Sequence, residues 1–319
     1  MLPTGSLVSL PLLHELADEP FRGPVSPNMV ADRIKAGDLG DCPDLMRRAF
    51  ARLLLGAAAD ARQPVGSAMR PGGIDGIRIP PRLDNAHAVA AGRTPILVWF
   101  HGGGYVFGSP ETHWRVGAAM AALTAMTVFL PRYRLAPEHP WPAQLDDALT
   151  VVRALQGDGR RVVLAGDSAG GHLALTTALA LARERRPVAA LLLCSPNTDR
   201  SGLNTTRDAH SARDVMNDDA QDTALARLAF GEMPPDDPQV SPLLDELSLL
   251  PPTCIEVGDN EVLRDDALLL ARRGQAAGAS LDCHVERDVF HMWQLWTPWL
   301  EPANTSLARL AAFARSQVR

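Results

Sequence analysis

The chain has 319 residues, of which 46% are hydrophobic and 21% are charged, and its formal net charge is −6. This composition suits one large globular α/β domain, or such a core with a lid, and no basic run predicts nucleic-acid binding. No apolar stretch is long enough to cross a bilayer, so we expect neither a nucleic acid nor a membrane as partner.

Residues 1–13 lack the basic region and the cleavage site of a signal peptide. The four cysteines form no C-x-x-C pair, and free thiols in a reducing compartment are the simplest interpretation. No His and Cys spacing suggests a metal site, and the glycine motifs that bind phosphates are missing from the sequence. We therefore predict a cytoplasmic protein that uses no metal and no cofactor.

The first part of the chain is helix-prone but irregular. Its best helix is predicted at 43–59, because Asp44 can cap it and apolar residues such as Met46 and Leu53 fall on one side. A short strand is expected at 72–80 and a polar loop at 84–94. We expect the segment up to about residue 75 to form part of a cap.

Apolar strands and helices then alternate. Strands are predicted at 96–100, 126–130, 161–165, 188–194, 253–257 and 281–286, and helices at 111–123, 143–156, 169–185, 264–277 and 302–315. This order predicts a mostly parallel sheet with helices on both faces. The segment at about 199–240 breaks the alternation, holds one helix at 220–230, and is predicted to complete the cap of a single domain, 1–319.

The strand at 161–165 leads into Gly166-Asp167-Ser168-Ala169-Gly170, which fits the Gly-x-Ser-x-Gly pattern of a nucleophile elbow. Small residues flank Ser168 because the turn is sharp, and a side chain at Gly166 or Gly170 would collide with its neighbours. An isolated match would indicate an ordinary turn before a helix. Here a strand precedes the motif and a helix follows it, so we predict that Ser168 is a nucleophile.

A second glycine motif follows the strand at 96–100. His101 is followed by three glycines, and consecutive glycines let the backbone approach a ligand closely. The N–H groups of Gly103 and Gly104, with that of Ala169 at the helix start, are predicted to form an oxyanion hole. The alternative is a flexible glycine loop without a ligand.

A general base and an acid are expected after the last two strands. His291 follows the last strand and is the predicted base. Of the alternatives, His101 is expected to be structural and His172 to pack against its neighbours, while His139 sits between prolines and His284 within a strand. The acid follows the strand at 253–257. Asp265 and Asp266 fall within the next helix, and local chemistry does not choose between Asp259 and Glu261.

Four motifs in this order resemble those of the hormone-sensitive-lipase-like α/β-hydrolases: 101–104, 133–140, 166–171 and 289–291. The resemblance implies an α/β-hydrolase fold with a helical cap, a Ser-His-acid triad, and carboxylic-ester hydrolysis. The family's Asp-x-Leu-x-Asp acid motif matches 261–265 here, which implies Glu261 as the acid. The proteins it resembles are often homodimers.

We therefore predict a serine carboxylesterase that acts on small to medium apolar esters or lactones through an acyl-enzyme. Asn197 stands where we expect an aromatic residue in the family, and the N-terminal segment matches nothing familiar. These departures leave open a lyase or cyclase that uses the same pocket. A binding protein without catalysis is a third hypothesis, which a complete triad argues against.

Overall fold

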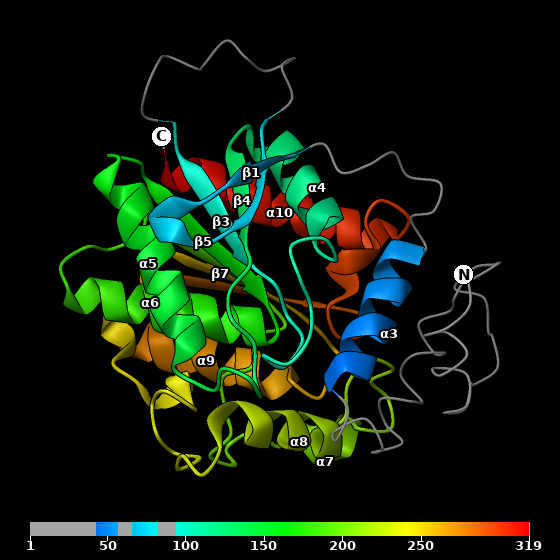
Figure 1. Ribbon diagram of the computed structural model, residues 1–319. Helices are drawn as coiled ribbons and strands as arrows, with labels where there is room; N and C mark the ends of the chain where they lie inside the picture. The colour runs from blue at the N-terminus through cyan, green and yellow to red at the C-terminus, as the bar shows by residue number, and fades with distance from the viewer. Residues whose placement is uncertain (1–42, 57–65, 82–93, 319) are drawn as a thin grey trace.

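The computed structural model describes residues 43–56, 66–81 and 94–318 (Figure 1). Their core is an eight-stranded sheet in the order β1-β2-β4-β3-β5-β6-β7-β8. The strands are β1 (Ser67–Met69), β2 (Gly76–Ile79), β3 (Ile96–Phe100), β4 (Thr127–Pro131), β5 (Val162–Asp167), β6 (Ala190–Cys194), β7 (Thr253–Gly258) and β8 (Leu281–Glu286).

The predicted mostly parallel sheet is confirmed. Strands β3 to β8 pair in parallel, with Ile96 opposite Thr127 and Val162, while β2 is antiparallel to both β1 and β4. The sequence did not indicate β1, because three residues of Ser, Ala and Met carry no strand pattern. β1 pairs with β2 at one edge of the sheet, so residues 67–69 belong to it.

The inner strands are apolar runs because helices cover both their faces. Every residue of β3, β4, β5, β6 and β7 is buried, whereas in β8, at the sheet edge, only Leu281 is buried. Cys194 and Cys254 are buried in β6 and β7 as free thiols, as predicted, while Cys42 lies outside the described residues.

Helices form the outer layers. Figure 1 shows α4 (Trp114–Thr124) and α10 (Glu301–Gln317) together on one side of the sheet, and α5 (Ala143–Gly157), α6 (Ala169–Arg183) and α9 (Arg264–Ala276) on the other. Three more helices are α3 (Pro43–Gly56), α7 (Thr206–His210) and α8 (Asp219–Phe230), and short 3-10 helices span Pro71–Gly73, Pro242–Leu244, Leu247–Leu249 and Trp293–Trp296.

Most boundaries fall within a few residues of the predicted ones. Helix α4 begins at Trp114 rather than at 111, because Ser109 and Thr112 exchange side-chain-to-backbone hydrogen bonds that hold a turn there. Helix α7 has five residues and gave no periodic signal. Among the described residues, no helix is long and apolar enough to cross a membrane.

The segment between β6 and β7 lies over one end of the sheet. In Figure 1, α7 and α8 lie together at the bottom of the view, on the same side as the loop that follows β3. The contact is close, since a Cβ atom placed on Gly104 would lie 2.6 Å from the Leu225 side chain of α8. The loops that carry the predicted site therefore meet the region 199–240.

Candidate active site

Ser168 stands in a sharp turn between β5 and α6. Its φ is 53° and its ψ is −121°. Residues other than glycine adopt this backbone conformation only where the surrounding structure holds them in it. A Cβ atom on Gly166 would lie 2.2 Å from the Gly170 carbonyl oxygen, and one on Gly170 would lie 2.1 Å from that of Phe100. A side chain at either glycine would therefore collide with the backbone, as predicted. This strand-turn-helix geometry is that of a nucleophile elbow.

The glycine loop after β3 turns back tightly. Gly103 has a φ of 115° and Gly104 a φ of 58°, and the Gly103 carbonyl accepts the N–H groups of Val106 and Phe107. Within the described ranges, the N–H groups of Gly103 and Gly104 donate to no other residue. Ala169 is the first residue of α6, where N–H groups have no partner inside the helix.

Asp167 joins this loop to the elbow. Its carboxylate accepts the N–H of Gly102 at 2.9 Å and the indole N–H of Trp99 at 2.8 Å, and Nε2 of His113 lies 3.1 Å away. Burial opposes the charged form of Asp167, but His113 and these hydrogen bonds hold its pKa below the ordinary value. Sequence reasoning missed His113, because nothing in the pattern around it marks a functional residue.

Helix α3 supports the same loop from outside. The Arg47 guanidinium donates to the carbonyls of Val106 at 2.8 Å and Ala136 at 2.9 Å, and it forms an ion pair with Glu138. Phe50 packs on Phe107 with ring centroids 4.9 Å apart. A segment without recognisable chemistry thus braces the loops that follow β3 and β4.

His291 and Glu261 form a buried pair. Nδ1 of His291 lies 2.8 Å from one Glu261 oxygen, and the other oxygen accepts the Ser195 hydroxyl at 2.8 Å and the Gly258 N–H at 2.6 Å. Asp259, the alternative acid, is half-buried and instead accepts the backbone N–H of Asp288. The geometry therefore joins Glu261, not Asp259, to the imidazole.

The surroundings of His291 favour its charged form. Burial alone would lower the pKa of His291, but the hydrogen bond and charge of Glu261, together with Asp214 and Asp222, raise it above the ordinary value. A base with such a pKa attracts a proton strongly.

Further contacts bring the His291 loop to the elbow. A Cβ atom on Gly102 would lie 2.9 Å from the Met292 sulfur and 2.3 Å from Asp167, so the residues next to His291 and Ser168 approach the same glycine. The Asn197 N–H donates to the Ser168 carbonyl at 3.2 Å. The ends of β3, β5, β6 and β7 and the loop after β8 thus gather the predicted residues at one site.

The comparisons with known proteins agree with this geometry. A family model described as the alpha/beta hydrolase fold matches residues 97–295, more than half of the chain. The chain belongs to the α/β-hydrolase family. Its resemblance to the hormone-sensitive-lipase-like group is confirmed as well, because a solved esterase of the bacterial hormone-sensitive lipase family is 29% identical, with a TM-score of 0.78 over 97% of both chains.

Two curated relatives of this α/β-hydrolase are enzymes. An acetyl-hydrolase of Streptomyces hygroscopicus is 34% identical over 70% of this chain and 76% of its own length. An esterase of Acinetobacter venetianus is 31% identical over 71% of this chain and 76% of its own length. The protein is thus a hydrolase of ester bonds, and the lyase or cyclase alternative is not favoured.

Two of the alternative histidines are buried in contacts with tyrosines. His101 stacks on Tyr133 at 4.2 Å, and its burial beside His113 lowers its pKa to about 3. His172 meets the Tyr105 hydroxyl at 2.6 Å, and burial lowers its pKa to about 3 as well. His139 and His284 are exposed.

An aromatic cluster lies beside the glycine loop. Tyr105, Trp141, His172 and Phe230 pack mutually with ring centroids 5.3–5.8 Å apart. Tyr105 follows Gly104, His172 lies one helical turn after Ser168, and Phe230 ends α8. All four rings are buried, so the cluster packs the core against the segment 199–240.

Asn197, which departs from the expected family pattern, belongs to a buried ionic network. Its side-chain amide donates to Asp222 at 2.8 Å, and Arg207 contacts Asn197, Asp222 and Asp266. Burial opposes the charge of Asp222, but Arg200 and Arg207 hold its pKa well below the ordinary value. The network ties α7 and α8 to α9. The sequence singled out Asn197 and placed Asp266 in a helix, but it gave no sign that the two belong to one network.

Two clusters in the described chain place possible metal ligands within 4.8 Å of one another: Cys254, Glu256 and His284, and Asp214, Glu261 and His291. Both oxygens of Glu256 already bind Arg309, at 2.9 and 2.7 Å. Glu261 is engaged as described above. Neither arrangement favours a cation over its present partners.

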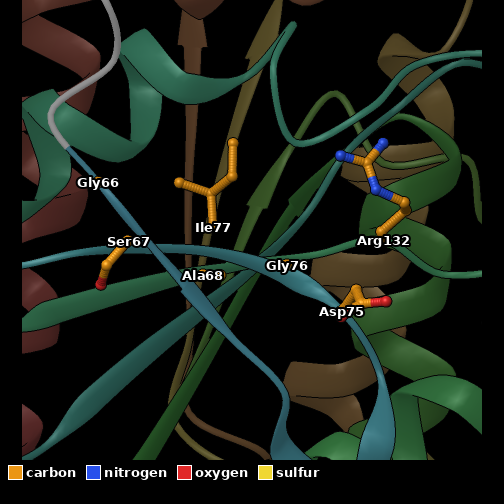
Figure 2. Close-up of a pocket in the computed structure, with 7 residues that line it drawn as sticks. All are labelled: Gly66, Ser67, Ala68, Asp75, Gly76, Ile77 and Arg132. Carbon is orange, nitrogen blue, oxygen red and sulfur yellow. The ribbon is translucent and has the colours of Figure 1, made fainter.

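A hollow of about 390 Å³ lies at the β1–β2 edge of the sheet. Figure 2 shows the residues that line it. Strands β4 and β3 lie between its β2 wall and the Ser168 strand β5. None of its lining residues belongs to the predicted site; they are Gly66, Ser67, Ala68, Asp75, Gly76, Ile77 and Arg132.

Proposed function

We propose that this hydrolase is a serine carboxylesterase with Ser168 as nucleophile, His291 as general base and Glu261 as the acid that orients it. The observation that carries the proposal is the buried Glu261–His291 hydrogen bond at 2.8 Å beside the Ser168 elbow. Because Nδ1 of His291 faces Glu261, its Nε2 is left to accept the Ser168 proton.

In acylation, the Ser168 oxygen attacks the ester carbonyl carbon while His291 takes the hydroxyl proton. The oxyanion then accepts hydrogen bonds from the N–H groups of Gly103, Gly104 and Ala169. As the intermediate collapses, His291 returns the proton to the departing alcohol. Water repeats the sequence on the acyl-enzyme, which frees the acid and restores Ser168.

The substrate is proposed to be a small to medium apolar ester or lactone. The aromatic cluster of Tyr105, Trp141, His172 and Phe230 supports an apolar acyl or alcohol group, and the acetyl-hydrolase relative supports a short acyl chain. The segment 199–240, with residues up to about 75, is proposed as the cap, because α8 lies against Gly104.

Hydrolysis of p-nitrophenyl esters of increasing acyl length tests the proposal. We expect turnover with an optimum at short to medium chains, and a loss of several powers of ten in Ser168→Ala. Turnover by Ser168→Ala at the wild-type rate would refute the mechanism. An optimum at long chains would refute the substrate class alone.

A further inference from the structure

A second carboxylate lies beside the catalytic pair. Asp214 follows α7, in the loop that leads to α8, and its side chain is fully buried. One oxygen accepts the backbone N–H groups of Met216 at 3.0 Å and His291 at 3.3 Å, and the other accepts that of Val262 at 3.1 Å. Asp214 thus binds the backbone of His291 and that of Val262, the residue next to Glu261.

The carboxylate is also near the reacting side chains. Ligand atoms of Asp214, Glu261 and His291 all lie within 4.8 Å of one another. Two negative groups therefore face one imidazole, one from the core and one from the segment 199–240. At this separation in a buried site, a carboxylate changes the proton affinity of a histidine considerably.

Other charged groups surround this trio. From α8, Asp222 adds to the negative potential at His291, and Arg207 of α7 balances it through an ion pair with Asp222. His210, at the end of α7, contacts the Glu261 carbonyl through its ring and accepts the Asp214 N–H at its own carbonyl. Among the described residues, His291 is the group whose positive charge lowers the pKa of Asp214.

We propose that Asp214 is a positioning residue for His291, which fixes both triad loops by its backbone hydrogen bonds and adds a second negative charge beside the imidazole. This role rests on the proposed esterase mechanism. It makes the segment 199–240 part of the catalytic assembly rather than only a cover over the substrate.

The protonation of Asp214 is consistent with this role. Burial raises the pKa of Asp214 to about 6, with His291 lowering it and Glu261 raising it. The charge of Asp214 in turn raises the pKa of His291. Its removal should therefore lower the pKa of His291 and move the acidic limb of the pH–rate profile to lower pH.

The test compares Asp214→Asn with the matched control Asp199→Asn. Asp199 is also fully buried in the segment 199–240 and also accepts backbone N–H groups, those of Ser201 and Asn204. The pKa of His291 is measured by NMR titration in each variant, and the imidazole signal is assigned because it disappears in His291→Asn. In parallel, kcat/KM for p-nitrophenyl butyrate is measured from pH 5 to 9.

In Asp214→Asn we expect the pKa of His291 and the acidic limb to fall by about one unit or more. We also expect kcat/KM at pH 8 to fall about tenfold to a hundredfold, because the triad loops lose a shared anchor. Asp199→Asn should leave both pKa and limb in place. A pKa of His291 unmoved in Asp214→Asn would overturn the proposal, even with a lower rate, because a purely structural role predicts that result.

A second arm keeps Asp214 in place. In Glu261→Gln the His291 resonance should titrate in two steps, because Asp214 remains as a coupled neighbour. A single step would overturn the proposal. The NMR readout needs no turnover, so a wild-type protein inactive on all esters would refute the proposed function while the titration still decides the role of Asp214.

Discussion

Replacing Gly170 by alanine should disable the enzyme through the backbone alone. In an ordinary helix this change adds about 1 kcal/mol of stability, because alanine is the better helix former. Here the new Cβ would lie 2.1 Å from the Phe100 carbonyl oxygen and 2.5 Å from that of His101, where ordinary contacts begin at 3.4 Å. Helix α6 and the end of β3 must therefore separate by more than about 1 Å.

That displacement acts on both stability and catalysis. Overpacking of this kind costs about 1–3 kcal/mol, which corresponds to a melting temperature lower by several degrees. It also moves Ser168 and the Ala169 N–H away from the glycine loop, and a misplacement of about 1 Å can reduce the rate about a hundredfold. We expect both effects by thermal unfolding and by kcat on p-nitrophenyl butyrate.

Gly157→Ala is the matched control, because its new Cβ meets nothing within 4 Å at the end of α5. It should leave kcat unchanged and stability equal or slightly higher. Gly170→Ala with wild-type kcat and melting temperature would refute the close packing on which the elbow argument depends.

Three further predictions concern the triad and its support. Glu261→Gln should lower kcat about a thousandfold or more. Both Glu261 oxygens accept hydrogen bonds, and the amide would replace one of them with an N–H donor facing His291 or Gly258. The kcat of Asp259→Asn should stay within about threefold of the wild-type value. The acidic limb of kcat/KM should lie above about pH 6.5, because the pKa of His291 is raised and the base must be neutral; a limb below that value contradicts the assigned environment. Arg47→Ala should lower the melting temperature by about 2–4 °C, because it removes hydrogen bonds worth about 1 kcal/mol. Arg48 is exposed, so Arg48→Ala should leave the melting temperature unchanged. Differential scanning fluorimetry measures both.

The sequence predicted those parts of the fold that local patterns determine. Buried parallel strands are apolar runs such as 96–100, and strained turns need glycines such as Gly166 and Gly170, so the sheet, its helices and the elbow could be placed in advance. The short strand β1 and the five-residue α7 escaped because so few residues carry no periodicity. Their positions depend on pairing and packing with distant segments.

The candidate site, too, could be predicted only where local motifs mark its residues. Motif order pointed to Ser168 and His291, but local chemistry left Asp259 and Glu261 open, because the choice depends on how the turn after β7 meets the β8 loop. Asp214 and Arg47 could not be found from any motif. Each acts through backbone groups far away in the chain, and only the packed structure brings those partners together.

Covalent labelling tests the central claim most directly. Wild-type protein treated with diethyl p-nitrophenyl phosphate should gain one diethylphosphoryl group on the peptide that carries Ser168, with hydrolysis lost in the same proportion. Ser168→Ala should neither react at that peptide nor turn over esters. Stoichiometric labelling of a different residue, or full ester turnover by the labelled protein, would contradict the account.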